Sequence, residues 1–115
     1  MRIRSVVEEY EVMLRPPTAE APGVDSARGK GEWKVYADGS RQCKVSIHNL
    51  KLPEGTQLQL TVNGHVIAAL IVERGNARFR RETEKGELVP YVRASEVLQV
   101  LLDGTAILEG SFYAE

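Results

Sequence analysis

Apolar and polar residues alternate along much of the chain, and a period of two is typical of β-strands that bury one face. The clearest case is a pair of apolar runs on either side of Asn63-Gly64. In the first run, Leu58, Leu60 and Val62 alternate with polar residues. Asn-Gly tolerates the positive φ angles that both central residues of a type I′ turn require, so this segment predicts a β-hairpin.

The second run, from Val66 to Val72, is apolar on both of its faces. A strand without a wet face is expected inside a sheet or beneath a partner. We therefore expect this strand to be central or covered. If the structure instead exposes Ile67, Ala69 and Ile71 together, these side chains are a possible partner surface.

The same alternation recurs between turn residues such as Asp38-Gly39, Pro53-Glu54-Gly55 and Asp103-Gly104. The expected strands lie at residues 9–15, 31–37, 41–50, 57–62, 66–72, 77–83, 97–102 and 106–113. Short helices at residues 5–14 and 95–102 are the alternatives for two of them. About eight strands with a turn roughly every ten residues predict an all-β fold, a single antiparallel β-sandwich of Ig-like character.

A chain of 115 residues is expected to form one domain, residues 1–115. Residues 1–15 would supply an N-terminal strand, residues 16–30 a flexible loop, and residues 31–115 the main β unit. The inward positions of the expected strands predict the core residues, which are Trp33, Val35, Val45, Ile47, Leu58, Leu60, Val62, Phe79, Val100 and Phe112.

The composition is that of an ordinary globular protein, with 43% hydrophobic and 27% charged residues. A net charge of −1 disfavours nucleic acid and anionic membranes as partners. No apolar run reaches the roughly 20 residues of a transmembrane helix. The N-terminus carries Glu8, Glu9 and Glu11 where a signal peptide would be apolar. We expect either a cytoplasmic protein or an exported fragment whose signal has been removed.

Few residues point to catalysis or to a cofactor. Cys43 is the only cysteine, and it shares an alternating face with Val45, where a free thiol is expected to be buried. His48 and His65 have no metal-ligand spacing, and no serine lies in a nucleophile motif. We therefore predict no catalytic residues, no metal site and no cofactor, with a small enzyme on the same scaffold as an alternative.

Arg78, Arg80 and Arg81 form the densest basic group, with Phe79 between them. Some small barrels bind single-stranded nucleic acid through aromatic and basic residues on a strand, which makes these arginines a possible anion or nucleic-acid contact. Phe79 is nevertheless expected to face away from Arg78 and Arg80, as in ordinary core alternation. We favour a solvated strand face over a nucleic-acid site.

Aromatic side chains offer a further candidate surface. The alternation places Trp33 in the core, with an exposed binding platform as the alternative. Tyr36 is expected on the outward side with Glu32 and Lys34. It is therefore the best tyrosine for a partner surface.

From Gly29 onward the chain resembles a small β domain found in bacterial proteins. The resemblance rests on Leu52-Pro53-Glu54-Gly55-Thr56, on Val62-Asn63-Gly64, on Val89-Pro90 and on the closing segment DGTAILEGSFY. The early part also resembles the chordin-like CHRD β domain, although the histidine-rich segment of that domain is absent. The resemblance implies a compact β-sandwich, often exported, and transfers no catalytic residues.

These patterns together predict a non-catalytic binding or structural β module. The expected partner is a protein, or a second copy of the chain bound through a sheet edge or an apolar face. A small β-barrel that binds single-stranded nucleic acid is the rival prediction.

Overall fold

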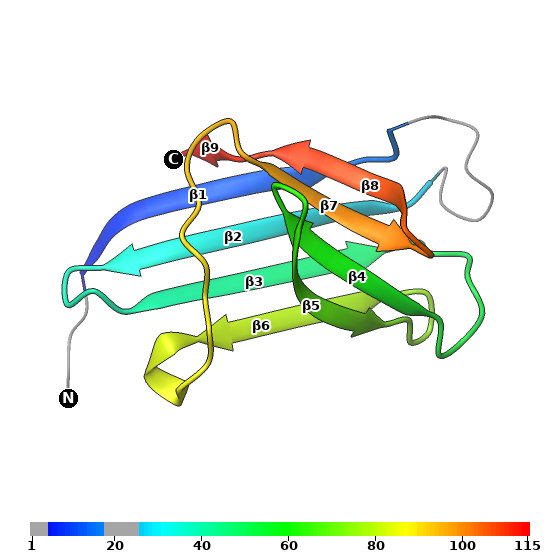
Figure 1. The fold of residues 1–115 in the computed structure, drawn as a ribbon, viewed down its shortest axis with the longest axis horizontal. Helices are drawn as coiled ribbons and strands as arrows, with labels where there is room; N and C mark the ends of the chain where they lie inside the picture. The colour runs from blue at the N-terminus through cyan, green and yellow to red at the C-terminus, as the bar shows by residue number, and fades with distance from the viewer. Residues whose placement is uncertain (1–4, 18–25) are drawn as a thin grey trace.

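The computed structural model describes residues 5–17 and 26–115, and in these ranges the regular secondary structure is β-strand apart from one short 3-10 helix. Nine strands of these ranges form two antiparallel sheets that face each other as a sandwich (Figure 1). The predicted all-β sandwich is therefore confirmed, while its Ig-like character stays a prediction.

The two sheets, here called sheet A and sheet B, contain five and four of the described strands. Sheet A has the order β6-β3-β2-β1-β9, built from β1 (Val6–Leu14), β2 (Arg28–Tyr36), β3 (Arg41–His48), β6 (Ala77–Glu82) and β9 (Tyr113–Ala114). Sheet B has the order β5-β4-β7-β8, built from β4 (Gln57–Val62), β5 (His65–Ile71), β7 (Val97–Leu102) and β8 (Thr105–Ser111). A short 3-10 helix, η1 (Thr83–Lys85), follows β6.

The core lies between the inner faces of the two sheets. Val12 of sheet A and Leu60 of sheet B are both fully buried there. Trp33 is 2% exposed and meets Phe112 edge-on, with 4.9 Å between the ring centroids. The indole N–H of Trp33 donates to the carbonyl of Pro90 at 3.2 Å, so its polar atom is satisfied. The exposed-platform alternative for Trp33 is therefore wrong.

Backbone contacts between β1 and β8 close one side of the sandwich. Arg15 and Glu109 exchange two backbone hydrogen bonds of 3.0 and 2.9 Å. The chain then passes through buried Phe112 into β9, which pairs with β1 in sheet A. Gly110 lies so close to β1 that a Cβ would stand 2.0 Å from the carbonyl oxygen of Met13. This side of the sandwich therefore depends on a glycine.

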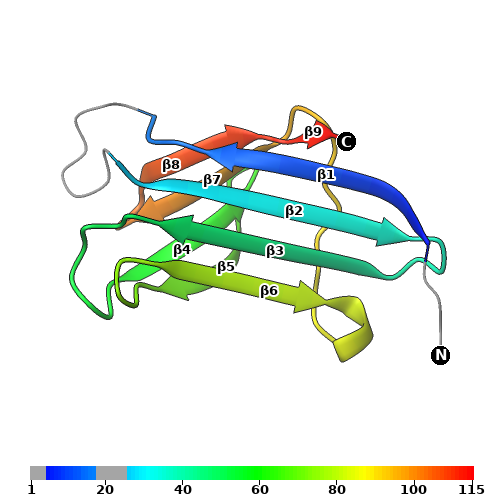
Figure 2. The same ribbon diagram turned by 180° about the vertical axis from the view of Figure 1, so that it is seen from behind.

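The opposite side of the sandwich is open. Within the described residues, β5 and β6 are the edge strands of their sheets on this side. A tight turn at Arg74-Gly75 joins them (Figure 1, Figure 2). Glu73 and Asn76 close this turn by exchanging backbone hydrogen bonds of 2.8 and 2.9 Å. Both strands consequently have an edge available for pairing.

The position of β5 contradicts the sequence-based prediction for this segment. The expectation of a central strand is wrong, because β4 takes the inner position between β5 and β7. Val66 and Ile71 of β5 are 58% and 46% exposed, so no other part of the described chain covers them. An apolar run indicates a preference for burial, but it does not say which neighbour supplies that burial.

The local predictions agree more closely with the structure. Asn63 and Gly64 have φ angles of 49° and 83°, which confirms the predicted turn. The helical alternatives at residues 5–14 and 95–102 are wrong, because β1 and β7 occupy these segments. Strand β2 begins at Arg28 rather than Gly31, because Arg28 already pairs with β3. Residues 18–25 of the predicted loop lie outside the described ranges.

Candidate functional site

Sheet A presents a charged outer face. The Lys30 ammonium lies 2.9 Å from Glu11 and 3.3 Å from Glu32, and the Lys85 ammonium lies 3.1 Å from Glu82. Opposite charges thus meet across β1 and β2, within β2, and between β6 and η1, which balances this face internally. The outward positions of its strands carry Glu9, Glu11, Met13, Lys30, Glu32, Lys34, Gln42, Lys44, Ser46, Arg78, Arg80 and Glu82.

The Glu11 carboxylate is the most strongly held group on this face. A hydrogen bond from Lys30, and a second from the Tyr113 hydroxyl 2.8 Å away, lower the pKa of Glu11 to about 2. The same contact raises the pKa of Lys30 above its ordinary value. Both groups are therefore charged at neutral pH and held by each other.

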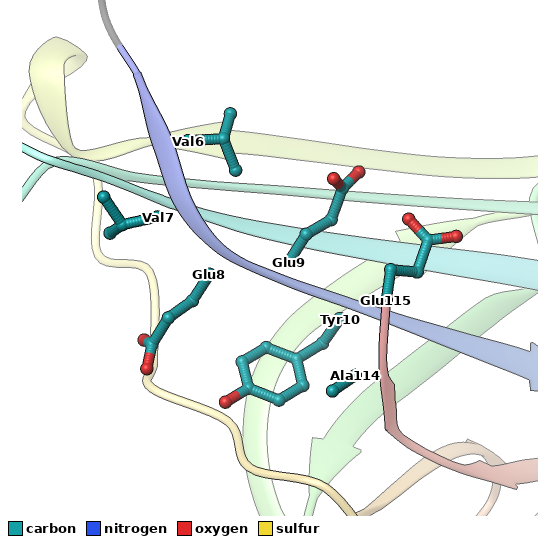
Figure 3. Close-up of a pocket in the computed structure, with 7 residues that line it drawn as sticks. All are labelled: Val6, Val7, Glu8, Glu9, Tyr10, Ala114 and Glu115. Carbon is teal, nitrogen blue, oxygen red and sulfur yellow. The ribbon is translucent and has the colours of Figure 1, made fainter.

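A shallow hollow of about 350 Å³ lies beside this cluster, between β1 and β9 (Figure 3). Figure 3 shows the carboxylates of Glu9 and Glu115 pointing to the same side of β1, away from the ring of Tyr10. The contact with Glu11 raises the pKa of the Glu115 carboxyl to about 7, because neighbouring carboxylates resist ionising together. The hollow is thus an acidic surface feature bordered by the outer face of sheet A.

Sheet B presents an outer face of a different character. Its outward positions carry Gln57, Gln59, Thr61, Val66, Ala69, Ile71, Gln99, Leu101, Ala106 and Glu109. Among these described positions Glu109 is the one charged side chain, and it accepts a hydrogen bond of 3.1 Å from Gln99. A shallow groove of about 400 Å³ on this face is lined in part by Gln59, Ala69 and Leu101. We call this surface the uncharged face.

Thr61 is a buried polar residue at the centre of the uncharged face. It is 1% exposed, with Val66 and Gln99 opposite it on the two flanking strands. In the described part of the chain its hydroxyl is the one buried side-chain polar atom without a hydrogen-bond partner. A buried hydroxyl without a partner costs on the order of 1–3 kcal/mol, so the packing of this face includes an uncompensated polar group.

Strand β5 also exposes backbone groups at the open side of the sandwich. The N–H of Val72 donates to the carbonyl of Thr56 at 2.9 Å, so Val72 and Thr56 are a hydrogen-bonded pair at the end of the β4–β5 ladder. Because bonded and non-bonded pairs alternate along an antiparallel ladder, the N–H and C=O groups of Ala69 and Ile71 point away from β4. A groove of about 620 Å³ borders these residues, between β5 and the start of β6.

The structure brings part of the predicted partner surface together. Ala69 and Ile71 are exposed on the outer face of β5, as the prediction requires. Ile67 is half-buried at a β-bulge and packs against the core. The expectation that Tyr36 is available to a partner is wrong, because Tyr36 is only 9% exposed and its hydroxyl donates to a side chain of β3. Sequence reasoning missed Val66, whose position beside the Asn-Gly turn could have indicated exposure.

The three predicted basic residues do not form one surface. Arg78 and Arg80 lie on the outer face of β6, whereas Arg81 alternates to the other face with its guanidinium 5.0 Å from the ring of Phe79. Arg80 lies 3.5 Å from Glu82. A base-stacking platform would need Phe79 on the same face as the basic group, and β6 separates it from Arg78 and Arg80.

The nucleophilic and metal-ligating candidates lie in environments that suit a structural role. Cys43 is fully buried, and burial raises the pKa of its thiol to about 11. The thiolate is therefore scarce at neutral pH. His48 and His65 are exposed. The described residues hold no group of three or more His, Cys, Asp or Glu side chains that could bind a metal ion.

The uncharged face and the adjoining β5 edge are thus the surface that the geometry singles out.

In the described ranges, no helix has the length and apolar character that crossing a bilayer requires. No protein-family model matches the chain, and no curated protein matches it.

Proposed function

We propose that this protein is a non-catalytic binding module that associates reversibly with a second copy of itself through the uncharged face. The observation that carries the proposal is the contrast between the two outer faces. The charges of sheet A are balanced by ion pairs such as Lys30–Glu11. Val66 and Ile71 on sheet B stand half-exposed on a face with little charge, and charged side chains meet Ile71 only where that face reaches the open edge. Exposed apolar groups that are not scattered singly mark interaction surfaces.

A second copy suits the chemistry of this face. Each face carries one charged side chain among its described outward positions, Glu109, so two copies meet with little electrostatic repulsion. An interface around a two-fold axis brings the same patch together twice. The amides of Gln57, Gln59 and Gln99 each supply both donors and acceptors, so they can pair with identical groups. The Leu101 and Ala69 side chains between them supply apolar contact.

The size of the face predicts a weak dimer. Four strands about 4.8 Å apart and roughly six residues of about 3.3 Å long give a surface on the order of 400 Å². Two such surfaces bury on the order of 800 Å², which is below the roughly 1,200–2,000 Å² of stable complexes. We therefore expect a dimer that forms only at high protein concentration.

Light scattering and sedimentation over a wide concentration range test this proposal, with Ile71→Lys and Met13→Lys as matched variants. Both residues are 46% exposed, Ile71 on the uncharged face and Met13 on the outer face of sheet A. The mass of the wild type and of Met13→Lys should rise toward that of a dimer, while Ile71→Lys stays monomeric. A wild type that is monomeric at every concentration, or equal effects of both variants, contradicts the proposal.

A further inference from the structure

The turn between β5 and β6 contains a residue that its backbone disfavours. In the described chain, two-residue turns of the same left-handed kind occur at Asn63-Gly64, Arg74-Gly75 and Asp103-Gly104. Asn and Asp tolerate positive φ because their short side chains bond locally. Arg74 holds a φ of 52° without such a side-chain bond, and its backbone N–H instead donates to the Glu54 carboxylate at 3.0 and 3.2 Å. Strain of this kind persists where the surrounding structure over-determines it, and it is common at ligand-binding sites.

Arg74 and Arg78 both line the groove that borders the edge of β5. Neither guanidinium has an ion-pair partner within the described residues, in contrast to Arg80 beside Glu82. Glu73 is the one acidic residue in the described lining of this groove. Glu54 lines the adjoining hollow beside Arg74, so the excess of positive charge lies toward Arg78. Two unpaired arginines in one groove form a favourable environment for carboxylates.

The same groove is bordered by the outward backbone groups of β5. The N–H and C=O groups of Ala69 and Ile71 point away from β4 and need hydrogen-bond partners of the kind that another strand supplies. β5 contains no lysine, arginine or proline that would block such pairing. A peptide in extended conformation matches these groups, and its alternate side chains fall on opposite faces.

We propose that an extended acidic segment of a partner protein adds to sheet B along β5 and places a carboxylate against Arg74 or Arg78. This site goes beyond the proposed self-association, because it uses the strand edge and the arginines rather than the uncharged face. Main-chain hydrogen bonds supply affinity in this kind of recognition, and the arginines select acidic sequences.

Charge favours this occupant over a second copy of β5. β5 has no acidic residue to offer the arginines of another copy. Pairing two β5 edges would also bring the two β6 strands toward each other in the second layer. Arg78 and Arg80 of each copy would then approach like charges, which is destabilising.

The test is an NMR titration with a ten-residue peptide in which glutamate alternates with valine or threonine. Its matched control is the same peptide with lysine in place of glutamate, and the protein is kept at a concentration where it is monomeric. We expect the glutamate peptide to bind at least tenfold more tightly, because charge-assisted hydrogen bonds are lost in the control. The amide signals of Ala69, Ile71 and Arg74 should shift and become protected from hydrogen exchange.

Arg74→Asn gives a second readout that a purely structural arginine would not produce. Asparagine accepts the left-handed backbone, so the melting temperature should rise by a few degrees while the affinity for the glutamate peptide falls about tenfold. Arg78→Gln should also weaken binding. Arg80→Gln serves as the control, because Arg80 lies outside the groove and beside Glu82, and its affinity should stay within about twofold of the wild type.

Four outcomes overturn the proposal. The first is no binding of the glutamate peptide at millimolar concentration, and the second is equal binding of both peptides. The third is tighter binding of an oligothymidylate than of the peptide, with shifts on β6, which would assign the arginines to nucleic acid. The fourth is protection of the β5 amides without peptide as the Ile71→Lys variant, whose uncharged face is blocked, is concentrated; this would assign the edge to a second copy.

Discussion

The two outer faces of this sandwich expose comparable apolar side chains but differ in what surrounds them. Met13 on sheet A and Ile71 on sheet B have the same exposed fraction, 46%. Met13 lies on a face balanced by ion pairs such as Lys30–Glu11, whereas Ile71 lies opposite Gln57 on a face with little charge. Exposure of an apolar side chain alone therefore does not mark an interaction surface. The charged groups around that side chain also matter, because ion pairs within the monomer leave such a face less suited to a partner.

The two outer faces belong to sheets that we expect to unfold together as one body. Gly110→Ala tests this, and of the substitutions considered it should have the largest effect on the free energy of unfolding. Gly110 belongs to β8 of sheet B, and an added Cβ would stand 2.0 Å from the Met13 carbonyl of sheet A. Because the nearest atom is backbone, the two sheets must move apart at their closed side. We expect a loss of about 3 kcal/mol in the free energy of unfolding, measured by urea denaturation.

Gly104→Ala is the control for that substitution. Its φ is 81°, but nothing lies within 4 Å of the added Cβ, so only backbone strain of about 1 kcal/mol is expected. Both variants should unfold in one transition seen by tryptophan fluorescence and by circular dichroism. Separate transitions, or a Gly110→Ala variant as stable as Gly104→Ala, would show that the sheets are not so tightly joined.

Thr61→Val tests whether the buried hydroxyl at the uncharged face lowers the stability of the fold. The Thr61 hydroxyl is buried without a partner in the described residues, so replacing it by a methyl group should stabilise the fold by about 1 kcal/mol. Thr83→Val is the matched control, because the Thr83 hydroxyl accepts a hydrogen bond of 2.9 Å from the N–H of Arg41. That variant should lose about 1 kcal/mol in the same denaturation experiment. Destabilisation by Thr61→Val would mean that its hydroxyl has a partner.

Glu11→Gln tests the charge balance of sheet A through pH dependence. The folded pKa of Glu11 is about 2, below its ordinary 4.5, so Glu11 stabilises the fold above pH 4.5 and loses this effect as the pH falls toward 2. The pKa of Glu115 is raised to about 7, so its effect has the opposite sign, and stability falls as the pH rises from 4.5 to 7. The difference in melting temperature between wild type and Glu11→Gln should therefore be greatest near pH 4.5.

Glu8→Gln is the control for the pH experiment. Glu8 lies on the same strand, and Figure 3 shows its carboxylate directed away from Glu9 and Glu115. The change with pH in the difference from the wild-type melting temperature should be smaller for Glu8→Gln than for Glu11→Gln. A constant difference for Glu11→Gln would show that the cluster does not couple to folding.

The strands and turns were predictable because their signals are local. Asn63-Gly64 indicated a turn through the φ angles that the two residues tolerate, and the structure has those angles. The alternation also placed Cys43 inward and separated Phe79 from Arg78, as observed. A side chain's face within a strand follows from the two-residue period of the backbone, so neighbouring residues are enough to infer it.

The candidate site was only partly predictable, because it depends on neighbours distant in the sequence. Ala69 and Ile71 were identified from their apolar run, yet the exposure of Val66 and the burial of Tyr36 were not. Tyr36 alternates outward as expected but is covered where β2 reaches the turn into β3. Arg74 carried no sequence signal as a site residue, since only the fold places it with Arg78 in one groove.

The amino-acid sequence is enough to infer that this chain forms antiparallel strands, where the turns lie, and which side of most strands is apolar. These properties follow from backbone sterics and from hydrophobic periodicity within a few residues. The position of β4 inside sheet B and of β5 at its edge follows from the folded arrangement alone. Strand order depends on pairings between distant segments, and an apolar strand such as β5 can be buried by its own chain or left for a partner.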